Sequence, residues 1–244
     1  MIEICCGSYE DALQAYLGGA KQIELNSALH LGGLTPSIGS LLLTKEKTDM
    51  KVICMVRPRG AGFNYTEIEY KQMLMDAKIL LENGADGIAF GFLSSDLTID
   101  IDRTKEMISL IKSYDKEMVF HRAFDCVIDP IQSIETLISI GVNRILTSGL
   151  QATAMAGKDM LKLLQKEYGD KIEILAGSGI NATNTKELME YTKIRNIHSS
   201  CKNWKNDITT SGKSVNYCYG PVGHENDYDV VSKELVEKLI GVVR

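Results

Sequence analysis

The segment Ile2–Asn26, "IEICCGSYEDALQAYLGGAKQIELN", decides the expected fold of the chain. In its first residues, Ile2–Cys5, β-branched isoleucine alternates with Glu3 and Cys5, in the pattern of a strand. Ser8 is then placed as the N-cap of a helix that continues over Ala12–Leu17, and a pair of glycines ends that helix. Gln22–Asn26 follows as a second strand. This order of strand, helix and strand predicts one unit of a parallel sheet.

The same alternation repeats along the rest of the chain. Further strands are expected at Val52–Arg57, Gly87–Phe92, Met118–His121, Arg144–Thr147, Ile172–Ala176 and Asn196–Ser199. Helices are expected at Ile38–Thr44, Glu67–Glu82, Arg103–Tyr114, Pro130–Ile140, Met155–Tyr168, Thr183–Tyr191 and Val230–Val243. Eight strands with helices between most of them predict an α/β fold, a (β/α)8 TIM-like barrel, with residues 1–244 as a single domain. A doubly wound open sheet is the alternative, but the first strand is not followed by the glycine-rich fingerprint of that fold.

One segment departs from this alternation. Residues 201–229 are long, polar and dotted with glycine, and they come directly before the last helix. A loop of this length in a compact domain is functional, serves as an assembly arm, or is disordered.

Composition excludes several classes of protein. The net charge is −5 with both signs mixed along the chain, and no basic block suggests nucleic acid. No apolar run is long enough to span a membrane, and the first residues do not form a secretory leader. The six cysteines include no CxxC pair. We therefore expect a cytoplasmic protein with reduced thiols.

Chargeable side chains gather where the predicted strands end. Because side chains alternate along a strand, Glu3 and Cys5 share one face, as do Glu24 and Asn26. The carboxyl ends of barrel strands carry function. The candidate catalytic residues are Glu3, Glu24 and His121, and the candidate substrate-binding residues are Arg57, Arg122, Asp125 and Ser148. The structural alternative is a closed network in which these charges only neutralise one another.

The stretch "AGSGINATN" adds a candidate anion site. Gly177, Ser178 and Gly179 end the seventh strand, and a helix is expected to start soon afterwards. Free backbone N–H groups beside a helix N-terminus favour an anion. The eighth strand ends in His198-Ser199-Ser200, which lacks a glycine for close phosphate approach.

Seven stretches together resemble the CutC copper-homeostasis family. They are the first segment quoted above, "LGGLTPS", "MVRPRG", "ADGIAFG", "FHRAFD", "ILTSG" and "AGSGINATN", and they run in order from Glu3 to about Ser200. The resemblance implies a TIM-like barrel, a cytoplasmic location, a homo-oligomer and a role in handling copper. It also implies Cu(I) binding through two cysteines. Cys5 matches the first of them, and Asn26 stands at the position of the second.

Two hypotheses about function follow. In the first, the protein handles copper and binds Cu(I) weakly through Cys5, because one thiolate and an amide make a poorer soft-metal site than two thiolates. In the second, it is an enzyme that acts on a small anionic substrate, phosphorylated or carboxylated, at the mouth of the barrel. Whether the chain is an enzyme is left open by the sequence.

Overall fold

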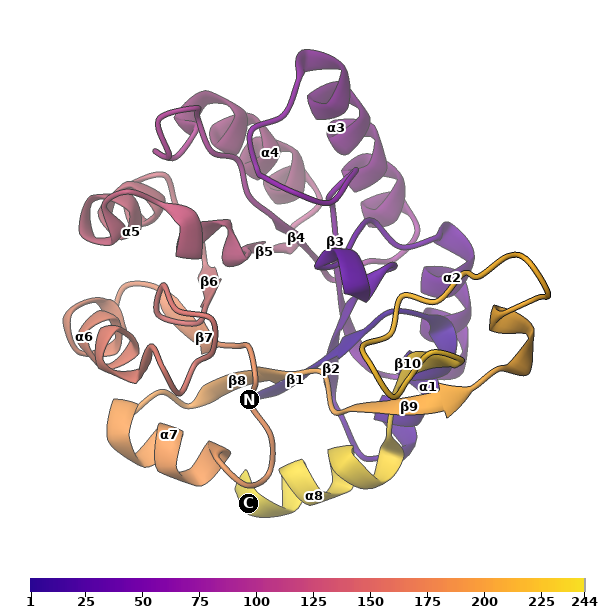
Figure 1. Cartoon of the computed structure of the whole chain (residues 1–244). Helices are drawn as coiled ribbons and strands as arrows, with labels where there is room; N and C mark the ends of the chain where they lie inside the picture. Colours follow the sequence, from indigo (N-terminus) through magenta and orange to yellow (C-terminus); the bar gives the residue numbers. More distant parts are fainter. Residues whose placement is uncertain (244) are drawn as a thin grey trace.

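A computed structural model describes residues 1–243 and contains the expected barrel (Figure 1). Eight parallel strands close on themselves in chain order. They are β1 (Ile2–Cys6), β2 (Gln22–Leu25), β3 (Lys51–Met55), β4 (Gly87–Phe90), β5 (Glu117–Phe120), β6 (Arg144–Thr147), β7 (Glu173–Ala176) and β8 (Asn196–Ser199). The closed barrel rather than an open sheet is therefore confirmed.

Helices form a ring around these strands (Figure 1). They are α1 (Tyr9–Leu17), α2 (Ile38–Lys47), α3 (Glu67–Glu82), α4 (Ile101–Ser113), α5 (Pro130–Ser139), α6 (Lys158–Tyr168), α7 (Thr185–Thr192) and α8 (Lys233–Val243). Local sequence explains where they begin. The Ser8 hydroxyl accepts the Asp11 N–H, as expected for the N-cap, and Thr66 and Glu69 form a capping box before α3. No helix within residues 1–243 is long and apolar enough to cross a membrane.

The barrel interior has an apolar layer and, below it, a charged layer. Ile53, Met55, Ala89, Val119, Leu146 and Leu175 form the apolar cluster on the inner face of the strands. At the amino ends, the Arg144 guanidinium lies 2.8 Å from Glu173, 3.6 Å from Glu117 and 3.9 Å from Glu3. These four residues all stand at the first or second position of their strands, so their charges close the lower end of the barrel.

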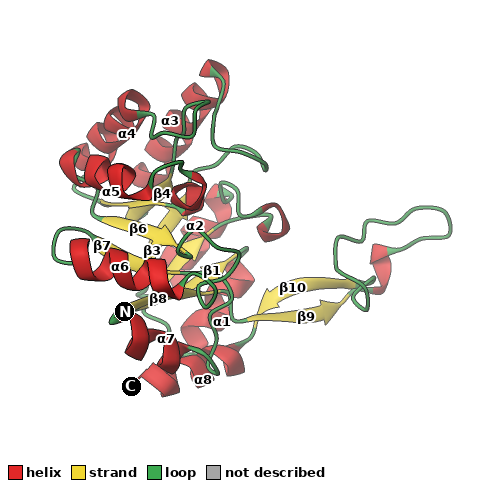
Figure 2. Ribbon diagram, turned by 60° about the vertical axis from the view of Figure 1, so that its left-hand side comes forward, coloured by secondary structure: helices red, strands yellow, loops and turns green. Residues whose placement is uncertain are grey.

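The segment after β8 is structured. β9 (Lys202–Asn206) and β10 (Asp227–Val231) pair as an antiparallel hairpin, and residues 207–226 connect them. We call residues 202–231 the arm. It projects sideways from the barrel (Figure 2). One sequence expectation is wrong here: the last helix was placed from Val230, but β10 takes that residue and α8 begins at Lys233.

Candidate functional site

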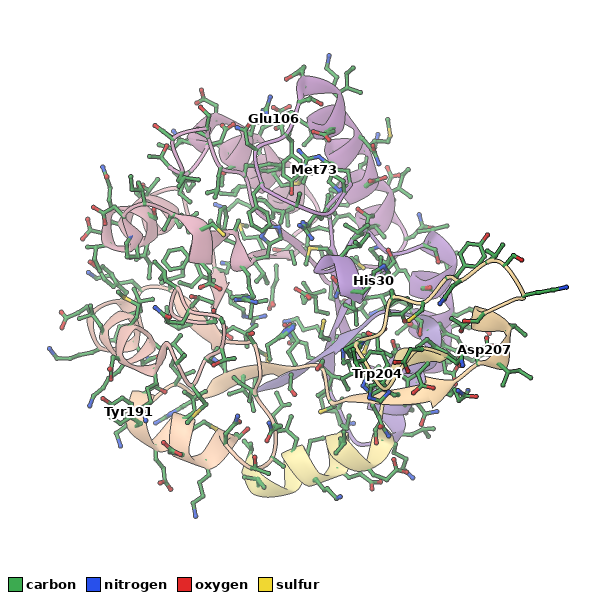
Figure 3. The ribbon with its side chains drawn as sticks, viewed as in Figure 1. His30, Met73, Glu106, Tyr191, Trp204 and Asp207 are labelled. Carbon is green, nitrogen blue, oxygen red and sulfur yellow. The ribbon has the colours of Figure 1, made fainter. Side chains whose placement is uncertain are left out.

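A cavity of about 430 Å³ opens at the carboxyl ends of the strands. Side chains from the barrel and from the arm line it. They include Cys5, Glu24, Asn26, Met55, Arg57, Phe63, His121, Arg122, Ser178, Gly179, His198, Lys202, Trp204, Tyr219 and Asp229. Figure 3 labels Trp204 and His30, two of the lining residues, on the side of the barrel where the arm lies.

Three potential metal ligands meet at the strands β1, β2 and β8. One ligand atom each from Cys5, Glu24 and His198 lies within 4.8 Å of the other two. The barrel closure explains this meeting, since β1 pairs with β2 on one side and with β8 on the other. Cys5 is directly opposite Glu24 in the first pair, and its thiol lies 3.8 Å from the Glu24 carboxylate.

A buried carboxylate orients the histidine of this cluster. The His198 Nδ1 atom lies 2.8 Å from Glu3 Oε1, while Gln22 donates a hydrogen bond of 2.5 Å to Glu3 Oε2. Burial alone would raise the pKa of Glu3, but the hydrogen bond and charge of His198 hold it below its usual value. Burial would lower the pKa of His198, and its hydrogen bonds to Cys5 and Glu3 raise it instead. Glu3 therefore lies beneath the cavity, as a support for His198, and does not line it.

The pKa values of the thiol and the carboxyl group of the cluster are both raised. Burial raises the pKa of Cys5 to about 12, which keeps the thiol neutral near pH 7. Burial is also the main cause that raises the pKa of Glu24, with a further contribution from the Glu3 charge. Asn26 donates to both residues, at 3.0 Å from Glu24 Oε2 and 3.6 Å from the Cys5 sulfur. Its carbonyl oxygen is buried without a hydrogen-bond partner in the described part of the chain.

Arg57 lines the cavity, but its hydrogen-bond partners differ from those predicted from the sequence. The sequence suggested that it pairs with the buried carboxylates. Instead its terminal nitrogens donate to the carbonyl oxygens of Leu31, Gly33 and Ala61, at 2.9, 3.1 and 2.5 Å. Its Nε atom is buried and has no hydrogen-bond partner within residues 1–243. The side chain is only 5% exposed.

His121 is a neutral histidine in the cavity wall. Burial, followed by the charge of Arg57, lowers the pKa of His121 to about 3. Its Nδ1 atom accepts the Ala123 N–H at 3.2 Å, so the proton of the neutral ring is on Nε2. That Nε2 atom is buried without a partner among the described residues. His121 Nε2 is therefore, after Arg57 Nε, a second buried donor without an acceptor among the described residues.

Arg122, Asp125 and Ser148 form a network that fixes the loops after β5 and β6. Arg122 Nε donates to Asp125 at 2.8 Å, and Asp125 also accepts from the Ser148 N–H and hydroxyl, at 3.0 and 2.9 Å. Asp125 was predicted to bind substrate, but its contacts join the loops after β5 and β6. Of the three, only Arg122 lines the cavity.

The turn after β7 is only partly placed as expected. Ser178 and Gly179 line the cavity and have positive φ angles of +80° and +70°. Gly177 packs against Leu146 and does not line the cavity. Helix α7 was expected to begin at Thr183 but begins at Thr185, and its N-cap residue Asn184 donates a hydrogen bond to the Gly179 carbonyl oxygen at 2.8 Å.

Sequence reasoning missed two parts of the site. His198 was placed at the end of the eighth strand without a role, because the pairing of β8 with β1 puts it beside residues almost 200 positions away. The arm was taken for a loop, although its residues Lys202, Trp204 and Tyr219 form the outer wall of the cavity. The aromatic residues spaced along 201–229 were the available signal for the second feature.

Comparisons with known proteins agree with this architecture. The sequence model of the CutC family matches residues 1–203. A family protein CutC of Treponema denticola is 45% identical over 240 residues, covering 98% of this chain and 97% of that protein. The solved structure of CutC from Streptococcus agalactiae, which is named for copper homeostasis, has a TM-score of 0.77 and 27% identity, covering 82% of this chain and 98% of that one. Phosphoribosyl anthranilate isomerase from Thermococcus kodakaraensis, at a TM-score of 0.56 and 15% identity over 100% of this chain and 98% of that one, shares the fold alone.

Proposed function

The chain belongs to the CutC family, and we propose that it binds a copper ion weakly at the floor of its barrel cavity. Cys5 is the principal ligand, with His198 and Glu24 beside it. The observation that supports this proposal is the meeting of three ligand atoms, from three neighbouring strands, within 4.8 Å. The name of the Streptococcus agalactiae relative points in the same direction.

The three donors suit copper, but their chemistry limits the affinity. Thiolate and imidazole are ligands that copper favours, whereas the Glu24 carboxylate suits harder ions. Glu3 holds the Nδ1 side of His198, which leaves Nε2 for a metal, and such a carboxylate–histidine pair is common behind metal ligands. A metal must displace the Cys5 proton, whose pKa is about 12, so affinity near pH 7 is reduced by proton competition.

Competition with a chromogenic Cu(I) chelator under anaerobic conditions tests this proposal. We expect one weak site in the unmodified protein, with an apparent affinity that rises about tenfold or more per pH unit above neutrality, because the metal must displace the Cys5 proton and also the proton of His198, whose pKa is raised. Cys5→Ser and His198→Gln should each weaken binding about tenfold or more. Cys126→Ser, which removes an exposed thiol outside the cavity, is the matched control. Equal binding by Cys5→Ser and the unmodified protein would refute the site, and stoichiometric resistance to the chelator would refute weak binding.

An enzyme acting on a small anionic substrate is the second candidate function. It is favoured by the adjacency of a raised-pKa carboxyl, Glu24, and a thiol, Cys5, in a cavity large enough for an organic molecule. Glu24 would move the proton in such a reaction. Deuterium exchange from D2O into small 2-oxo acids, followed by NMR, tests this role. Exchange that is lost in Glu24→Gln supports it, and the absence of exchange in the unmodified protein counts against it.

The family resemblance also leads us to propose a cytoplasmic homo-oligomer. All six cysteines are free thiols, which suits a reducing compartment. Analytical ultracentrifugation at several protein concentrations tests the oligomer, and a monomer throughout would exclude it.

A further inference from the structure

The cavity has room for much more than one ion. Its volume of about 430 Å³ lies in the range of sites for small organic molecules, roughly 300–1,000 Å³. Only three of its lining residues, Cys5, Glu24 and His198, belong to the metal cluster. The remaining wall needs another explanation.

Arg57 carries a buried charge that lacks a counter-ion. Its hydrogen bonds go to uncharged carbonyl oxygens, and no carboxylate within residues 1–243 forms an ion pair with it. Buried charges are costly unless they are paired, and a buried polar atom without a partner calls for a bound group or a water molecule. The Nε atom of Arg57 is such an atom, and the buried Tyr65 hydroxyl near this guanidinium is uncharged, so it does not balance the charge.

A second unused donor lies near the first. His121 Nε2 carries the ring proton and has no acceptor among residues 1–243. Phe63 contacts both side chains: its ring centroid is 5.1 Å from the Arg57 guanidinium carbon and 5.1 Å from the centre of the His121 ring. Phe63 itself lines the cavity and is only half-buried. A single aromatic ring therefore covers two donors and one uncompensated positive charge.

Two other charged side chains of the cavity are balanced by ion pairs. Arg122 is neutralised by Asp125 at 2.8 Å, and His198 by Glu3 at 2.8 Å. Lys202 and Asp229 line the outer wall with opposite charges. Glu24, the other carboxyl of the lining, bonds to Cys5 and Asn26 and forms no ion pair with Arg57 among the described residues, so the Arg57 end suits a single negative charge.

We propose that the cavity binds a small organic monocarboxylate, whose carboxylate accepts hydrogen bonds from Arg57 Nε and His121 Nε2 after the Phe63 ring turns aside. The organic part of the ligand extends toward the arm. There the aromatic side chains of Trp204 and Tyr219 border the mouth, held by stacking on His224 and His30 at 4.4 and 4.3 Å.

This inference deepens the second candidate function by naming the ligand class, and it does not depend on copper. It rests on Arg57, His121 and Phe63, whereas the copper proposal rests on Cys5, Glu24 and His198. Each proposal can therefore fail while the other stands.

The single tryptophan of the chain, Trp204, is a built-in reporter for the test. Metal-free protein is titrated with acetate, pyruvate and benzoate, and with pyruvamide and inorganic phosphate as neutral and dianionic comparisons. We expect a saturable change in Trp204 fluorescence, and a higher melting temperature, with at least one of the three monocarboxylates and not with pyruvamide. Arg57→Gln should weaken that binding about tenfold or more. Arg59→Gln, which removes an equal charge that is paired with Glu69, should leave it unchanged.

Three outcomes would overturn the proposal. They are no saturation by any of the three carboxylates, an equal response to pyruvamide, and a preference for phosphate. If Arg57→Gln does not fold, a crystal structure of the unmodified protein with the bound carboxylate decides. A carboxylate oxygen within hydrogen-bond distance of both Arg57 Nε and His121 Nε2 supports the proposal, and any other position refutes it. A copper titration on the same preparation shows whether the metal site has failed independently.

Discussion

The charge state of each residue in this site depends more on its neighbours than on its residue type. Cys5 is a thiol whose pKa is raised to about 12 by burial, and His121 is a histidine whose pKa is lowered to about 3 by burial and by Arg57. His198, backed by Glu3, is instead held toward its charged form. Two histidines on one barrel thus have opposite charge preferences, which residue type alone does not reveal.

Residue 26 sets the strength of copper binding in our proposal. Its side-chain nitrogen lies 3.6 Å from the Cys5 sulfur, so a thiol at this position would stand beside Cys5. We expect Asn26→Cys to tighten Cu(I) binding about tenfold or more in chelator competition, because two thiolates then converge. Asn26→Ser is the control, because serine is similar in size to cysteine but has no sulfur. An equal gain in both variants would show that relief of the buried Asn26 carbonyl, and not sulfur, causes the change.

At the scale of elements, α1 ties the arm and α8 to the barrel. The Asp11 carboxylate accepts the Val231 N–H of β10 at 2.8 Å and the Gly7 N–H at 2.9 Å. Gly18, at the end of α1, faces α8 so closely that a Cβ there would lie 2.7 Å from Val236 and 3.0 Å from the Lys233 carbonyl oxygen. The absence of a side chain at this position lets the last helix pack.

Gly18→Ala should therefore loosen α8. We expect a loss of about 1–3 kcal/mol in the free energy of unfolding, measured by urea denaturation, because the added methyl overpacks the contact. Gly241→Ala is the matched control within α8 itself. Nothing lies within 4 Å of its added Cβ, so a gain of about 0.5–1 kcal/mol from helix propensity is expected. A stabilised Gly18→Ala variant would contradict this account of the packing.

Sequence patterns predicted the helices and strands, but only part of the site. The bounds of α3, β6 and β8 are as expected, because caps, glycines and β-branched runs act locally. The hydrogen-bond partners of Arg57 are backbone atoms of two loops, one after β2 and one after β3, and no side-chain pattern predicts them. The Glu3–His198 contact depends on barrel closure, so it required the three-dimensional register.

On the scale of the whole molecule, the neutral state of His121 predicts how stability responds to acid. Its folded-state pKa is about 3, below the ordinary value of about 6.5, so the unfolded chain binds more protons between these values. The stabilisation is fully present above pH 6.5 and is lost as the pH falls toward 3, by up to about 1.4 kcal/mol per pH unit. Urea unfolding at pH 7, 6 and 5 measures it.

His121→Asn isolates this effect from the other titrating groups. Asparagine is a good N-cap and keeps an acceptor for the Ala123 N–H, but it does not titrate. We expect the variant to lose less stability than the unmodified protein between pH 7 and pH 5. Parallel pH profiles for the two proteins would mean that His121 is not the neutral, buried group described above.

Because β8 pairs with β1, the ligand set is completed only late in the synthesis of the chain. Cys5 leaves the ribosome early, whereas its partner His198 follows 193 positions later, which at roughly 5–20 residues per second takes on the order of 10–40 s. During that interval the nascent chain exposes Cys5 and Cys6 without the imidazole that completes the ligand set. Ligand capture is therefore a property of the finished barrel, and a ribosome-stalled fragment that stops before β8 should have no such site.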